Sequence, residues 1–147
     1  MSLSAIKDAL ITKCAAVTGV TTVFNDLPSK PPERSQCPAV EIAFRDPSLS
    51  VKPVASGLTN YTWHFQVRFM LYPIGVETLA QKEIDIEPYP ARFVAMAMGN
   101  NTLSATAKFV GFESDFKIGF FSFLGTDYYG FTWDLDVVEY IAETYAP

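Results

Sequence analysis

The stretch YTWHFQVRFML, residues 61–71, decides the fold of this chain. Aromatic and aliphatic side chains occupy every second position of it, beginning at Tyr61 and ending at Leu71. The positions between them hold Thr62, His64, Gln66, Arg68 and Met70. A period of two is typical of a β-strand that buries one face and turns the other to solvent. We therefore predict a strand over 61–71 whose apolar face covers the core.

The segments before this strand predict a second strand and two loops. Val40, Ile42 and Phe44 alternate with more polar neighbours, which indicates another half-buried strand. Four prolines in Pro28–Pro38 remove backbone donors, so we expect a mobile surface loop there. Asp46–Leu58 has no periodicity and contains Pro, Ser and Gly, which favours a second long, mobile loop.

Helical spacing occurs at the beginning and in the middle of the chain. Apolar residues recur every three or four positions from Leu3 to Val17, and Gly19 is well placed to end that helix. A short helix is predicted over Val76–Ile84 and a further helical run over Ala91–Met98. The prolines at 88 and 90 predict two helical pieces, or one strongly bent element.

The last third of the chain has β-patterned segments. They are Thr102–Phe112, Phe116–Leu124 and Tyr129–Tyr140. Strands that follow one another without intervening helices favour an antiparallel sheet. We expect one α+β domain over residues 1–147: an antiparallel (mixed) β-sheet with an N-terminal helix and a central helix packed on one face.

Composition excludes several classes of function. The 11 basic and 16 acidic side chains leave a net charge of −5 without a Lys/Arg cluster, so direct binding to a phosphate backbone is not expected. The acidic balance suits solubility, or a wall that DNA passes without sticking. Cys14 and Cys37 lack CxxC spacing, which favours reduced thiols in a cytoplasmic compartment. We expect neither a signal peptide nor a membrane span.

Residues with catalytic chemistry are few, so we expect no enzyme. His64 is the only histidine, and its place on the polar side of a strand favours a solvated or interfacial side chain over a catalytic base. Cys37 could be a nucleophile, but the sequence indicates no activating partner. Glu83, Asp85 and Glu87 favour a solvated charge run over a metal site. No catalytic, cofactor or metal site is predicted.

Apolar side chains are in surplus in one predicted hairpin. The candidates for a subunit or partner interface there are Phe116, Ile118, Phe120, Phe121, Phe123 and Tyr128. Adjacent positions of a strand point to opposite faces, so Phe120 and Phe121 would require cover on both sides. Either a partner protein covers one side, or the chain's own helices and loops do.

The order of these elements resembles the tail terminator, or tail completion, proteins of long-tailed bacteriophages. The resemblance covers nearly the whole chain and rests on the opening helix, the Pro-rich loop before Pro38-Ala-Val-Glu-Ile, and the aromatic strand 61–71. It continues with a helix that ends before Asn101-Thr102-Leu103 and with Tyr129-Gly130 leading into Trp133–Val138. The interrupting prolines at 88 and 90 depart from the continuous helix expected of this family.

The resemblance implies a structural virion protein and no cofactor. Such a subunit forms a homo-oligomer, expected to be a hexameric ring, which assembles in the host cytoplasm, caps the tail tube and meets the head–neck connector proteins while DNA passes through its lumen. The two loops would extend toward neighbouring subunits. The candidate interface also includes Arg45, Lys52 and Val54. Another head–tail joining or tail-tube-related protein remains an alternative. A small-ligand-binding α+β domain, with a pocket lined by Trp63, Phe65, Phe131 and Trp133, is the alternative from a different class.

Overall fold

A computed structural model describes residues 3–24, 28–55, 57–75, 77–99, 102–104, 107–110 and 115–142, with only the backbone described at 54–55, 99, 102–104, 107–110 and 140–142. The described strands form one seven-stranded mixed sheet. They are β1 (Thr22–Phe24), β2 (Ala39–Ala55), β3 (Leu58–Pro73), β4 (Thr102–Ser104), β5 (Ala107–Val110), β6 (Phe116–Phe123) and β7 (Thr126–Ala142). Their order is β1-β2-β3-β7-β5-β4, and β6 also pairs with β7. β1 runs parallel to β2, and every other pair is antiparallel.

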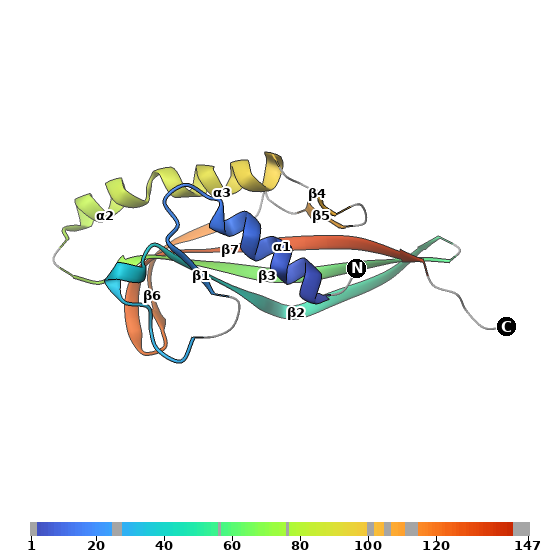
Figure 1. Ribbon diagram of the computed structural model, residues 1–147, viewed down its shortest axis with the longest axis horizontal. Helices are drawn as coiled ribbons and strands as arrows, with labels where there is room; N and C mark the ends of the chain where they lie inside the picture. Colours follow the sequence, from blue (N-terminus) through green and yellow to red (C-terminus); the bar gives the residue numbers. More distant parts are fainter. Residues whose placement is uncertain are drawn as a thin grey trace.

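Three α-helices pack on one face of this sheet. They are α1 (Leu3–Ala15), α2 (Leu79–Ile86) and α3 (Pro88–Gly99), and Figure 1 shows α2 and α3 nearly in line along the sheet with α1 beside them. Ile6 of α1 and Phe93 of α3 belong to the same buried cluster as the alternate strand residues Phe65, Phe69 and Phe131. The predicted α+β class, with an N-terminal and a central helix on one face, is therefore confirmed.

The central helical region is divided at the proline pair, as the sequence indicated. Thr78 caps α2, because its side-chain oxygen accepts a hydrogen bond from the backbone N–H of Gln81 at 3.2 Å. Pro88 and Pro90 both lie in the first turn of α3, where a missing N–H removes no intrahelical hydrogen bond. The prolines thus start a second helix.

The β2–β3 hairpin corrects the prediction of a loop at Asp46–Leu58. β2 continues through Ala55, and pairing with β3 extends as far as Ala55↔Leu58. The register shifts between Phe44 and Leu49, and Pro47 lies within that bulge. Proline is tolerated at bulges and edge strands because a missing ladder donor costs little there. The residues that broke the apolar alternation are accommodated by the bulge without ending the strand.

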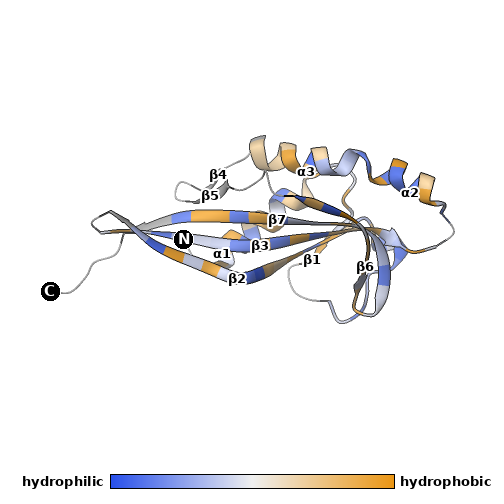
Figure 2. Ribbon diagram, turned by 180° about the vertical axis from the view of Figure 1, so that it is seen from behind, coloured by the Kyte–Doolittle hydropathy of each residue, from blue (hydrophilic) through white to orange (hydrophobic). Residues whose placement is uncertain are grey.

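The end of this hairpin extends beyond the helices. We call residues 49–55 of β2 and 58–63 of β3 the arm. Figure 1 and the reverse view in Figure 2 both show the arm at one end of the long axis and α2 at the other. The alternating blue and orange along β2, β3 and β7 in Figure 2 reflects the period of two.

β7 is the central strand of the sheet. It pairs with β3 from Pro73↔Tyr128 to Leu58↔Ala142, while its other edge pairs with β6 and then with β5. The predicted single strand Thr102–Phe112 is corrected to β4 and β5, which pair with each other as a hairpin. Part of that predicted segment lies outside the described residues.

A second, smaller core lies on the opposite face of the sheet. It contains Ala39, Met70, Phe123 and Tyr128, with Phe121, Phe24 and Cys37 packed against it. The Tyr128 hydroxyl donates a hydrogen bond of 2.6 Å to the carbonyl of Pro32, so the Pro28–Pro38 segment is fixed over this core. The same segment contains a short 3-10 helix (Arg34–Gln36), and Arg34 forms an ion pair of 2.5 Å with Glu77. Within the described residues, none of the helices has the length and apolar character needed to cross a bilayer.

Candidate functional site

The apolar surplus of β6 is divided between the core and the surface. Phe123 and Tyr128 are buried, 4% and 0% exposed, which corrects their assignment to an interface. Phe116 is half-buried and stacks on Trp133, and Phe121 is half-buried against the second core. Ile118 and Phe120 remain 50% and 55% exposed. The described residues therefore cover part of the hairpin and leave these two side chains about half exposed.

Ile118 lies beside a hollow between α2 and the edge strand β6. This hollow has a volume of about 780 Å³, and we call it the α2–β6 groove. Its lining residues are Ala80, Glu83, Ile84, Ile86, Glu87, Pro90, Ile118 and Tyr129. Ile84 is 63% exposed although it is one of the larger apolar side chains of α2. The groove thus combines an apolar floor with two carboxylates.

The other candidate residues, Arg45, Lys52 and Val54, all lie on β2. Lys52 is exposed on the arm, and its neighbour Val51 is 52% exposed. The side chain of Val54 lies outside the described part of the structure. Arg45 belongs instead to a polar cluster on the face of the sheet that carries no helix. The structure therefore does not bring Arg45 together with the α2–β6 groove.

That polar cluster surrounds His64, the position singled out by the sequence. His64 Nδ1 lies 2.7 Å from Asp136 Oδ1, and His64 Nε2 lies 2.8 Å from the Ser50 hydroxyl. Arg45 Nη2 also donates to Asp136 Oδ1 and lies 3.1 Å from His64 Nδ1. Pairing of His64 with Asp136 across β3 and β7 brings two of these residues together, and β2 supplies Arg45 from its bulge and Ser50 from the regular strand after the bulge.

The cluster has the order of a Ser-His-Asp triad, but its surroundings suit a structural role better. Asp136 Oδ1 accepts hydrogen bonds from a guanidinium as well as from the imidazole, so this carboxylate also anchors the β2 bulge. Acyl transfer requires, in addition, donors for an oxyanion and a recess for the substrate beside the nucleophile. Ser50 is exposed on the helix-free face and does not line the α2–β6 groove. The arrangement joins three strands around a bulge.

Cys37 and the carboxylates of α2 are the remaining reactive side chains named from the sequence. Burial raises the pKa of the Cys37 thiol to about 11, although the nearby Arg34 lowers it, so the thiol is protonated at neutral pH. Glu83 and Asp85 lie on α2, where residues two apart do not share a face, and Asp85 accepts hydrogen bonds from Tyr72 and Gln81. Within the part of the chain that is described, no group of three His, Cys, Asp or Glu side chains could hold a metal ion.

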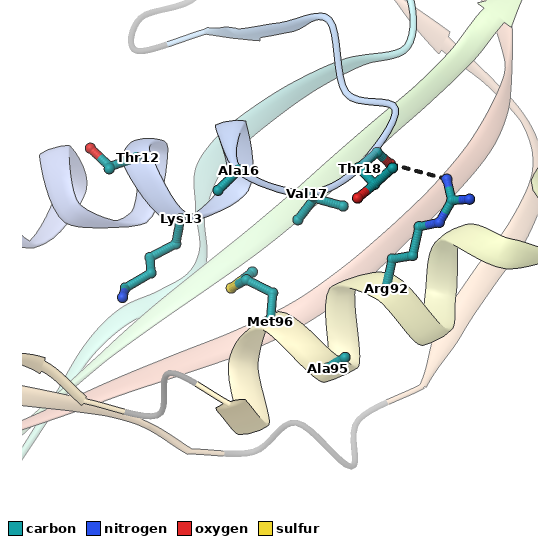
Figure 3. Close-up of a pocket in the computed structure, with 8 residues that line it drawn as sticks. All are labelled: Thr12, Lys13, Ala16, Val17, Thr18, Arg92, Ala95 and Met96. Carbon is teal, nitrogen blue, oxygen red and sulfur yellow. Dashed lines mark hydrogen bonds between the residues drawn. The ribbon is translucent and has the colours of Figure 1, made fainter.

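A second hollow, of about 530 Å³, lies between the end of α1 and α3 (Figure 3). Its lining contains the cationic side chains of Lys13 and Arg92. Arg92 donates a hydrogen bond of 3.0 Å to the carbonyl of Thr18, the dashed line in Figure 3, and its guanidinium lies over the ring of Tyr89. Arg92 is therefore engaged in holding the segment after α1 against α3.

The aromatic pocket expected of a small-ligand-binding domain is filled by packing. Phe65, Phe131 and Trp133 are all 0% exposed. Trp133 stacks on Phe116 at 5.0 Å between ring centroids and meets Phe93 edge-on. Trp63 lies at the margin of the core and donates a hydrogen bond of 3.1 Å to Glu139. These rings thus form part of the core.

Sequence reasoning missed the groove and the polar cluster for the same reason. Each site joins residues distant in sequence, such as Ile84 with Ile118 and His64 with Asp136. Two features of the sequence could have indicated these sites: Ile84 lies among charged residues, and His64 lies among the polar positions of its strand. Comparison of the chain with protein-family models and with curated proteins finds no match.

Proposed function

We propose that this protein is a structural subunit of a bacteriophage head–tail joint that assembles into a ring and caps the tail tube, as tail terminator proteins do. The observation that carries the proposal is the α2–β6 groove with its exposed apolar residues Ile84 and Ile118, together with the exposed Phe120 on the same strand as Ile118. Exposed apolar side chains gathered at one place usually mark a protein interface. A subunit that buries this surface against a neighbour would gain the stabilisation that the isolated chain lacks.

The arrangement of the molecule is consistent with this role. The confirmed α+β fold agrees with what the resemblance to tail terminators implies. The net charge of −5 suits a lumen that DNA passes without binding. On this proposal the protein is not an enzyme and binds no cofactor. Its partners are further copies of itself, expected to be six in a ring, the tail-tube protein and the connector proteins of the neck. Its location is then the virion, after assembly in the host cytoplasm.

Native mass spectrometry and electron microscopy test the proposal. The purified protein, over a range of concentrations, should form a closed oligomer with one dominant subunit number, expected to be six. Added to tubes polymerised from the tail-tube protein of the same genome, it should bind at tube ends and not along their sides. Protein that stays monomeric at every concentration and never associates with tube ends would contradict the proposal. Binding to a connector in place of the tube would identify the neighbouring head–tail joining role.

A further inference from the structure

We infer that the arm of one copy occupies the α2–β6 groove of the next copy in the proposed ring. This inference rests on the proposed function. The two surfaces lie at opposite ends of the long axis of the molecule (Figure 1). A contact between two different surfaces is heterologous, and it closes into a ring when the rotation between copies permits. The occupant of the groove is therefore a second copy of this chain.

The groove offers apolar contact area and negative charge. Ile84 and Ile118, 63% and 50% exposed, supply the apolar part. Glu83 and Glu87 line the same groove and have no ion-pair partner among the described residues. The nearest cation of α2, Lys82, is buried with its ammonium 5.2 Å from the ring centroid of Phe120. The groove therefore presents two exposed carboxylates to an incoming partner.

The arm has the complementary character. Lys52 is the only charged residue between Leu49 and Trp63, and it is exposed. Val51, at the preceding position of β2 and therefore on the opposite face of the arm, is 52% exposed, and Leu58, which pairs with Ala55 at the end of the hairpin, is 40% exposed. An apolar tip with one positive charge thus matches an apolar groove with two negative charges. Pairing of two grooves would instead place Glu83 and Glu87 of both copies against each other, which like-charge repulsion opposes.

Two single substitutions separate the surfaces. Val51→Asp introduces a charge on the arm, and Ile84→Asp introduces one in the groove. Both side chains are more than half exposed, so neither change should disturb folding, which circular dichroism checks. Leu79→Asp is the matched control, because Leu79 is an apolar residue of α2, 57% exposed, that does not line the groove. Native mass spectrometry should find both test variants monomeric and the control assembled like the unmodified protein.

Mixing the two variants provides the sharpest test. The Val51→Asp copy retains an intact groove and the Ile84→Asp copy retains an intact arm, so an equimolar mixture should give one-to-one heterodimers that cannot extend into rings. A mixture that stays monomeric would overturn the inferred pairing, as would a Val51→Asp variant that still forms the full oligomer. These two results leave the ring proposal standing if the unmodified protein assembles. An unmodified protein that is monomeric throughout would overturn both.

Charge reversal tests the electrostatic part of the contact. Lys52→Glu should raise the apparent dissociation constant between subunits by about tenfold, because it places like charges together. Combining it with Glu83→Lys and Glu87→Lys in the same chain should restore assembly. Failure of the triple variant to assemble while it remains folded, or unchanged assembly of Lys52→Glu, would show that Lys52 does not face these carboxylates.

Discussion

The indole of Trp133 and the ring of Phe116 stack with centroids 5.0 Å apart and planes 9° from parallel. This contact connects the edge strand β6 to the core beneath α3, because Trp133 also meets Phe93. Trp133 is completely buried, whereas Trp63, on the same face, is only partly buried. The two tryptophans of the chain therefore differ in what their removal should cost.

Trp133→Ala should lower the free energy of unfolding by about 3–5 kcal/mol, since it leaves a large cavity in the core. Trp63→Ala should cost distinctly less, because part of that ring is already in contact with solvent. Urea unfolding followed by circular dichroism measures both. Equal losses for the two variants would contradict the difference in burial between the two indole rings.

Gly130→Ala should be more damaging than the small change in size suggests. A methyl group at Gly130 would lie 1.8 Å from the carbonyl oxygen of Phe69, so β3 and β7 would have to separate. We expect a loss of about 3 kcal/mol or more. Gly125→Ala is the control: its φ of +83° imposes backbone strain of about 1–2 kcal/mol, but the added methyl meets no neighbour. In thermal unfolding, the melting temperature of Gly130→Ala should be well below that of Gly125→Ala.

Tyr128→Phe should loosen the Pro28–Pro38 segment while leaving the sheet intact. The variant loses the hydrogen bond to the carbonyl of Pro32 and leaves that buried acceptor unpaired, at a cost of about 1–2 kcal/mol. Limited proteolysis should then cut faster between residues 28 and 38, with cleavage elsewhere unchanged. Unaltered cleavage and unaltered stability would mean that Tyr128 does not fix this segment.

Alkylation of Cys37 should follow its raised pKa of about 11. The thiolate is the reactive form, so the iodoacetamide rate should rise about tenfold per pH unit from pH 7 to pH 10, with no plateau. Cys37→Ser should abolish this labelling, because the remaining thiol, Cys14, is completely buried and burial raises its pKa to about 12. A plateau near pH 8 or 9 would indicate an activated thiol.

Much of the fold could be predicted because its central strands keep a strict period. The alternation in 61–71 and from Tyr129 onward gave the inward face of β3 and β7 correctly, and the prolines at 88 and 90 marked the division between α2 and α3. The prediction of a loop over Asp46–Leu58 is wrong, because a strand that contains a bulge and two prolines has no regular apolar alternation. The pairing of this segment is supplied by its partner β3. The local sequence pattern of residues 46–58 does not show that this segment pairs with β3.

The exposure of the candidate interface residues could be predicted only in part, since burial depends on what packs over a residue. Ile118, Phe120 and Lys52 are exposed as expected. Phe123 and Tyr128 belong to the second core because the Pro28–Pro38 segment, about 90 residues earlier in the chain, returns over them. The ladder between β3 and β7 likewise determines that Asp136 meets His64. These outcomes depend on contacts between distant parts of the sequence.

The central position of β7 has a consequence for synthesis on the ribosome. Each earlier strand can leave the exit tunnel while the sheet still lacks the strand that separates β3 from β5 and β6. The strands β1, β2 and β3 must then wait with the outer edge of β3 unpaired. The complete sheet can therefore form only after β7 has been translated, and until then the open edge of β3 is a place where another strand could pair wrongly.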